Sequence, residues 1–120
     1  MDTFPPMCNE DFVYELGTQV PELQPIISDH LEYFEELLIH LLMSDILRFA
    51  TEQFGQSSTD VASRVLAVVD VAHRLGDDRL QNAVAVSFVE HFGAWPGETD
   101  EFLATWPSPL REELERQRNG

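Results

Sequence analysis

The fold is decided by the stretch Leu31-Glu-Tyr-Phe-Glu-Glu-Leu-Leu-Ile-His-Leu-Leu-Met-Ser-Asp-Ile-Leu-Arg-Phe49. From Leu37 to Phe49, nine of thirteen residues are large and apolar. An apolar surface this broad is typical of a helix that neighbours cover on several sides. Polar residues interrupt the run, and it is shorter than the roughly 20 mostly apolar residues that span a bilayer. The stretch therefore predicts the central helix of a small all-α domain.

Helix caps and breakers divide the rest of the chain around this central helix. Asp29 followed by Glu32 has the pattern of a capping box at its start, and Gly55 follows its expected end. Apolar spacing, prolines and glycines predict further helices on both sides of it. The expected helices cover about residues 10–20, 29–54, 60–75, 79–92, 99–106 and 109–117.

The expected architecture is a single domain over residues 1–120, with five to six antiparallel helices arranged as a bundle or as stacked helix pairs. Residues 1–8 contain Pro5-Pro6 and no periodicity, so we expect a loose lead-in there, onto which Met7 can still dock. Residues 116–120 are expected to fray. The length is sufficient for a hydrophobic core without disulfides or metals.

The charge of the chain is strongly acidic. Asp and Glu number 22 against 7 basic residues, all of them arginine, which gives a formal net charge of -15 at pH 7. Residues 1–47 carry ten acids and no arginine. Such a field repels nucleic acids and anionic lipid and favours a basic partner. The simpler interpretation is that the acidity only keeps a small protein soluble.

The first residues show neither a basic start nor an apolar segment of the signal-peptide type. Cys8 is the single cysteine, so no intrachain disulfide can form. These features predict a cytoplasmic protein.

Catalytic and metal-binding motifs are missing from the sequence. His30, Glu36 and His40 could together hold a metal, but no HExxH pattern is present, and a Glu and a His four residues apart are most often ordinary surface neighbours. Ser87 has no nucleophile-elbow glycines around it. We therefore expect no catalytic residues, no metal and no cofactor.

Two acidic segments are candidates for partner binding. The first contains Glu32, Glu35 and Glu36, and the second combines Trp95 with Glu98, Asp100 and Glu101. An aromatic anchor surrounded by carboxylates suits a basic protein. Alternatively, Trp95 and Trp106 close the end of the core, and the acids lie at solvated helix starts. Charge reversal of Glu98, Asp100 and Glu101 is expected to weaken partner binding without unfolding the domain.

Asp45 and Asn82 are polar residues within apolar helical segments. Each is either a buried hydrogen-bonding strut or part of the polar floor of a pocket, and we favour the strut.

Three segments carry a resemblance to a known family: residues 37–49, residues 76–90 and Leu110-Arg-Glu-Glu-Leu114, with Asp45 and Asn82 as the distinctive polar members. Together they resemble a family of small uncharacterised bacterial all-helical proteins, some of which act as immunity proteins beside polymorphic toxins. The resemblance implies an all-α fold and a break between Phe34 and Leu38, where the residue pattern itself predicts an unbroken helix. It implies no functional residues.

The leading hypothesis is therefore a cytoplasmic immunity protein that neutralises a basic, cognate toxin through acidic and aromatic contacts. One alternative is a non-catalytic accessory subunit of a larger assembly. Another is a small metal-dependent enzyme or regulator that uses His30, Glu36 and His40. A toxin gene next to this one would favour the first hypothesis.

Overall fold

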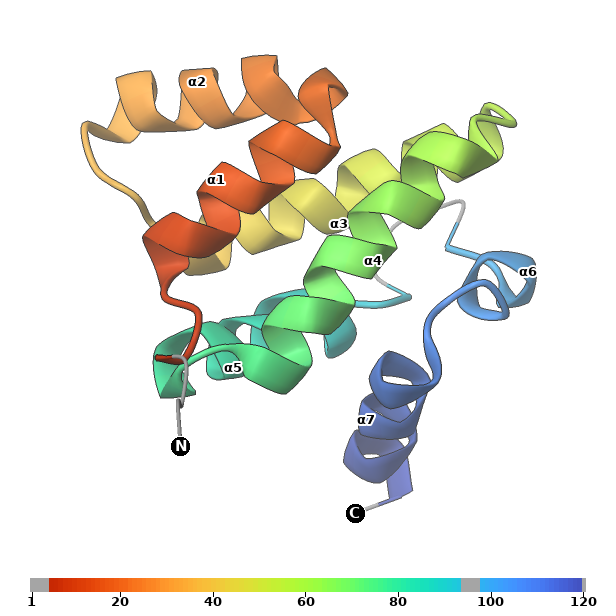
Figure 1. Ribbon diagram of the computed structural model, residues 1–120. Helices are drawn as coiled ribbons and strands as arrows, with labels where there is room; N and C mark the ends of the chain where they lie inside the picture. The colour runs from red at the N-terminus through yellow and green to blue at the C-terminus, as the bar shows by residue number, and fades with distance from the viewer. Residues whose placement is uncertain (1–4, 94–97, 120) are drawn as a thin grey trace.

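The computed structural model describes residues 5–93 and 98–119, and within them it confirms the all-α fold. Figure 1 shows seven α-helices in this part of the chain. A 3-10 turn, Pro21–Leu23, precedes α2, and a π-helical turn, Ala85–Val89, continues α5. The α-helices are α1 (Asn9–Gln19), α2 (Gln24–Phe34), α3 (Ile39–Gly55), α4 (Thr59–Leu75), α5 (Asp78–Val84), α6 (Asp100–Leu103) and α7 (Ser108–Asn119).

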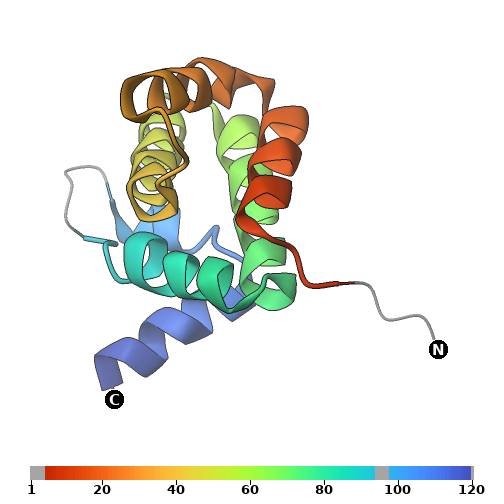
Figure 2. The same ribbon diagram turned by 90° about the vertical axis from the view of Figure 1, so that its left-hand side faces the viewer.

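The centre of the molecule is a hairpin of α3 and α4, joined by a short polar loop (Figure 1). Helix α1 packs along α4, and α7 contacts both α4 and the π-helical turn. Figure 2 shows α2 lying across one end of α1 and α3, and α5 lying across the other end. The long apolar segment at residues 79–92 packs against α3, as expected.

One continuous hydrophobic core joins these helices. Its fully buried members include Phe12 and Leu16 from α1 and a large group from α3. Trp106 is 2% exposed and lies against three phenylalanine rings, with ring centroids 5.1 to 6.0 Å apart, which places it in the core. The three are Phe88, Phe92 and Phe102.

The prediction of an unbroken central helix from residue 29 to residue 54 is wrong. The segment forms two helices, because α2 ends at Phe34 and Glu35 takes a left-handed conformation with φ 58°. Helix α2 also begins earlier than expected, at Gln24, because Pro25 is tolerated in a first helical turn. Asp29 therefore lies inside α2 and opens no helix. The break implied by the family resemblance is the correct alternative.

Both ends of the described chain contact the rest of the fold. Met7 donates a backbone hydrogen bond to Leu75 O at 2.9 Å and accepts one from Asp77 N–H at 2.8 Å. Helix α7 continues to Asn119, past its expected end at about residue 117. One reason is that Gln117 Nε2 donates to Ala85 O at 2.9 Å, a contact with the π-helical turn. The fraying expected for residues 116–120 stays a prediction.

Asp45 and Asn82 are both exposed, so the prediction that they are buried struts is wrong. Each lies on the solvent side of a helix whose opposite side enters the core, and the apolar neighbours in the sequence belong to that buried side. No helix among the described residues has both the length and the apolar character needed to cross a membrane.

Candidate functional site

The best candidate site is the α2–α3 corner, which we define as residues 31–38. Three large apolar side chains are exposed there: Leu31 is 40%, Tyr33 80% and Phe34 37% accessible to solvent. The predicted site residues Glu32, Glu35 and Glu36 belong to the same segment and are also exposed. The corner thus presents an aromatic anchor together with exposed acids, the combination that the sequence suggested for the segment around Trp95.

The corner is held in shape by His30, which is only 4% exposed. Its Nε2 atom accepts a hydrogen bond from the backbone N–H of Leu38 at 3.0 Å. In a continuing helix this N–H would instead donate to a backbone carbonyl of the preceding turn. Because Nε2 is an acceptor, the ring proton lies on Nδ1. The His30 ring also packs on Phe34, with centroids 4.9 Å apart, and Phe34 meets the Tyr33 ring edge-on at 4.8 Å.

A small groove of about 490 Å³ runs from the corner onto α3. Aromatic rings and carboxylates face it together, and Arg48 on its border pairs with Glu52 at 3.4 Å. Asp45 lines this groove, so the alternative of a polar pocket residue fits its position. Aromatic faces beside carboxylates are suited to a guanidinium or ammonium group. The aromatic and acidic members are Tyr33, Phe34, Phe49, Asp29, Asp45 and Glu52.

The second predicted group, Glu98, Asp100 and Glu101, lies at the start of α6. Asp100 and Glu101 are exposed in its first turn, where carboxylates interact favourably with the helix dipole. The Glu98 carboxylate accepts a hydrogen bond from the Gly93 N–H. Trp95 lies outside the described residues. Helix α6 and the α2–α3 corner are at opposite ends of the molecule in Figure 1, so the fold does not combine the two acidic groups into one surface.

The proposed metal ligands His30, Glu36 and His40 have different surroundings. His30 is used at the corner, whereas the Nδ1 atom of His40 lies 2.7 Å from Ser87 Oγ. Within residues 5–93 and 98–119, no group of three His, Cys, Asp or Glu side chains is placed to hold a metal ion. The contact between His40 and Ser87 was not predicted, because the two residues are 47 positions apart and no local pattern joins them.

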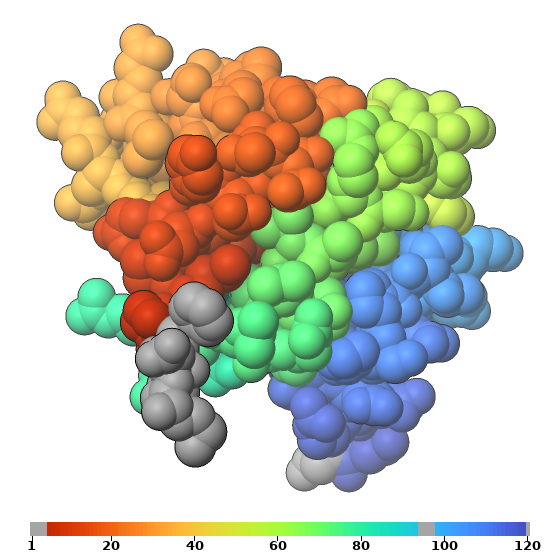
Figure 3. Space-filling model, in the orientation of Figure 1, coloured from red at the N-terminus to blue at the C-terminus, as the bar shows by residue number. Residues whose placement is uncertain are grey.

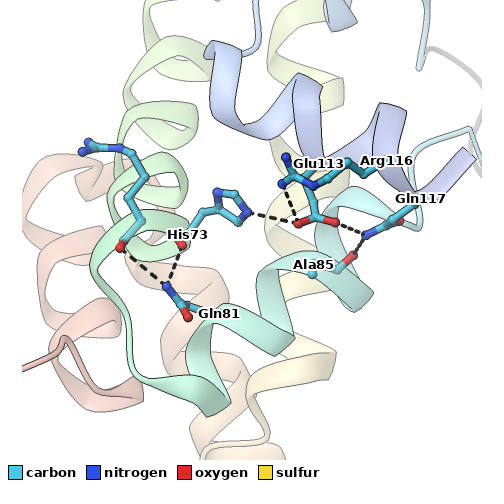
Figure 4. A network of polar contacts seen from close by, with 7 residues as sticks. His73, Gln81, Ala85, Glu113, Arg116 and Gln117 are labelled. Atoms are coloured by element: carbon cyan, nitrogen blue, oxygen red, sulfur yellow. Dashed lines mark hydrogen bonds and ion pairs between the residues drawn. The ribbon is translucent and has the colours of Figure 1, made fainter. Parts of the chain in front are cut away.

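A second unpredicted polar cluster joins α4, α5 and α7 (Figure 4). Glu113 is its centre: its carboxylate contacts His73 Nε2 at 3.5 Å, Arg116 Nη2 at 3.0 Å and Gln117 Nε2 at 3.2 Å. Burial alone raises the pKa of Glu113, but the hydrogen bonds from Arg116, Gln117 and His73 outweigh it and bring the pKa below its ordinary value of 4.5. A carboxylate held in its charged form by three donors on packed helices acts as a structural link.

The fold and the corner together define a small all-α domain with an acidic, aromatic surface. Within that class, the chain belongs to the family described as a domain of unknown function, DUF7674, which matches residues 14–120. The predicted resemblance to an uncharacterised helical family is thus confirmed. No curated protein and no solved structure shows significant similarity to the chain.

Proposed function

We propose that this protein is an immunity protein that binds a basic toxin and blocks it through acidic and aromatic contacts. The observation that carries the proposal is the α2–α3 corner, where Tyr33 is 80% exposed and where Glu32, Glu35 and Glu36 are also exposed. Tyr33 contacts Phe34 but leaves most of its surface in water, and tyrosine is enriched among residues that dominate binding energy at interfaces.

The chemistry of the corner fits arginine and lysine side chains. A guanidinium group can stack on Tyr33 or Phe34 and reach a neighbouring carboxylate at the same time. The groove beside the corner, with Asp29 and Asp45 in its lining, offers a second place for a cation. The net charge of -15 adds a long-range attraction that accelerates encounter with a basic protein at low salt.

The two acidic groups have different expected roles because of their separation. A protein interface of ordinary size covers about 800 Å² on each partner. The molecule measures 37 × 34 × 24 Å, so an interface centred on the corner does not extend to α6 at the other end. We therefore assign direct contact to the corner and long-range steering to Glu98, Asp100 and Glu101.

The test is a pull-down from lysate of the source cell, with the full chain as bait, at low and at high salt. The expected result is one basic protein, encoded beside this gene, that is retained at low salt and released at high salt. The measured affinity of that pair should fall about tenfold or more in Tyr33→Ala, because the anchor is lost. The double substitution Asp100→Asn and Glu101→Gln should slow association with that partner at low salt only.

Circular dichroism and thermal melting of each variant provide the control for folding. If no basic protein is retained in either salt condition, the proposal is wrong. If the partner binds Tyr33→Ala as tightly as the unchanged protein, the corner is not the contact surface.

A further inference from the structure

A larger groove, separate from the corner, lies between α1 and α4. It has a volume of about 910 Å³. Figure 3 shows the face on which α1 and α4 lie side by side. We call the groove between them the α1–α4 groove. Its apolar lining comes from Met7, Tyr14, Ala67, Val68, Val71 and Leu75. Tyr14 is 72% and Leu75 58% exposed, so large apolar surface is left in water along this groove.

Helix α4 carries two apolar stripes. The first, which includes Val65, Leu66 and Val69, faces the core. The second consists of Ala67, Val68, Val71 and Leu75 and lines the groove together with Arg64 and Arg74; Val68 is buried and also belongs to the core. This second set repeats at intervals of three and four residues, which is the spacing of a helix face that receives another helix. Ala67 and Leu75 are exposed, so this face of α4 leaves apolar surface in water although α1 packs beside it.

The charges on the rim of the α1–α4 groove favour a cationic occupant. Arg64 donates to both carboxylate oxygens of Glu22, at 2.8 and 3.1 Å, and Arg74 pairs with Asp70 at 3.1 Å. The two arginines of the lining are therefore already neutralised. The lining also includes the carboxylates of Asp11 and Glu15 on α1. A partner thus meets an apolar floor beside an acidic wall.

From this geometry we propose that the α1–α4 groove binds an amphipathic helix of a protein partner, with apolar residues on one face and Lys or Arg at its border facing α1. A second copy of this chain is disfavoured because it carries the same charge of -15 and the same acidic wall. The inference rests on the proposed function in one respect, the basic character of the partner. The proposal adds a second binding surface, and it specifies an amphipathic helix as the part of the partner that binds there.

The probe is a synthetic amphipathic peptide of Leu and Lys, about 15 residues and about 22 Å long as a helix, which matches the 17-residue α4. A Leu and Glu peptide with the same spacing is the charge control. Fluorescence anisotropy of labelled peptide, titrated with the full chain, gives the affinity. The Leu and Lys peptide should bind, and the Leu and Glu peptide should bind at least tenfold more weakly, by about 1.4 kcal/mol.

Ala67→Glu separates groove binding from general attraction to an acidic protein. Ala67 is exposed on α4, so the substitution is compatible with folding, and it makes the chain more acidic. Attraction by charge alone would therefore tighten binding of the Leu and Lys peptide. Occupation of the groove predicts at least tenfold weaker binding, because a carboxylate enters the apolar floor. Ala104→Glu, at an exposed position directly after α6, is the matched control and should bind like the unchanged protein.

Backbone chemical shifts of the complex should change most at Tyr14, Val71 and Leu75. Binding that is unchanged or tighter in Ala67→Glu, or shifts confined to the α2–α3 corner, would overturn the proposal, as would no binding of the peptide at all. The peptide experiment does not involve the natural partner. A basic partner that is retained from lysate by Ala67→Glu as well as by the unchanged chain would leave the proposed function intact and remove only the groove.

Discussion

Replacing Glu35 by glycine is expected to stabilise the protein. Glu35 follows the last residue of α2 and has φ 58° and ψ 11°, a left-handed conformation. For a residue with a Cβ atom this conformation costs roughly 1–2 kcal/mol. Glycine avoids that cost but loses about 0.5–1 kcal/mol through the greater freedom of its unfolded chain. The net gain in the free energy of unfolding is therefore about 0.5–1 kcal/mol.

The informative comparison is between Glu35→Gly and Glu35→Ala, since both remove the carboxylate and only glycine relieves the backbone. Urea denaturation should give a higher midpoint for Glu35→Gly with an unchanged slope, and a melting temperature higher by about 2–5 °C. Glu36→Gly is the second control. Glu36 is exposed and is not among the described residues with positive φ, so glycine should destabilise the protein there. A Glu35→Gly protein no more stable than Glu35→Ala would refute the assigned backbone cost.

Two further predictions concern His30 and Glu113. His30→Ala leaves the N–H of Leu38 without its acceptor and empties a buried site, so the free energy of unfolding should fall by about 2–4 kcal/mol. His30→Gln should lose less, because its amide oxygen can reach the same N–H. Equal losses of the two variants in urea denaturation would contradict the role of the hydrogen bond. Because the pKa of Glu113 is lower in the folded than in the unfolded state, its stabilising effect is present above the ordinary value of 4.5 and is lost as the pH falls through the folded value. Thermal melting across that range should show a shallower acid loss in Glu113→Gln than in the unchanged protein, and identical slopes would exclude Glu113 as a source of the pH dependence.

Local sequence patterns predicted the helices well where caps and periodicity agree. Helix α4 begins after Ser58 and ends before Gly76, and both boundaries are visible as a polar capping residue and a glycine. The apolar spacing between them is regular enough to indicate a helix despite five valines, which favour a strand.

The break at the α2–α3 corner could not be read from the same kind of pattern. Leu31 to Phe49 has continuous helical spacing, and neither glycine nor proline interrupts it. The break depends on His30 turning back to the N–H of Leu38, a contact between side chain and backbone that apolar periodicity does not encode. For the same reason, Tyr33 and Phe34 were expected within the helix predicted over residues 29–54 and not at an exposed corner.

Candidate acids were easier to locate than the surfaces they form. The exposure of Glu32, Glu35 and Glu36 agrees with their charge. The exposure of their neighbours Tyr33 and Phe34 depends on the turn between α2 and α3, which the sequence pattern did not predict. The α1–α4 groove was missed because its two walls come from separate helices. The spacing at positions 67, 71 and 75 of α4 was a local signal for one wall, visible beside the core-facing stripe.

The pairing of Met7 with the connection between α4 and α5 has a consequence for dynamics. Two backbone hydrogen bonds, Met7 N–H to Leu75 O and Asp77 N–H to Met7 O, hold this segment, and both Met7 and Gly76 line the end of the α1–α4 groove. A contact of this size opens at far lower free energy than the core helices. Amide hydrogen exchange at Met7 and Asp77 should therefore be faster than in α3, and the rate at these two amides measures how often the end of the groove opens while the core stays folded.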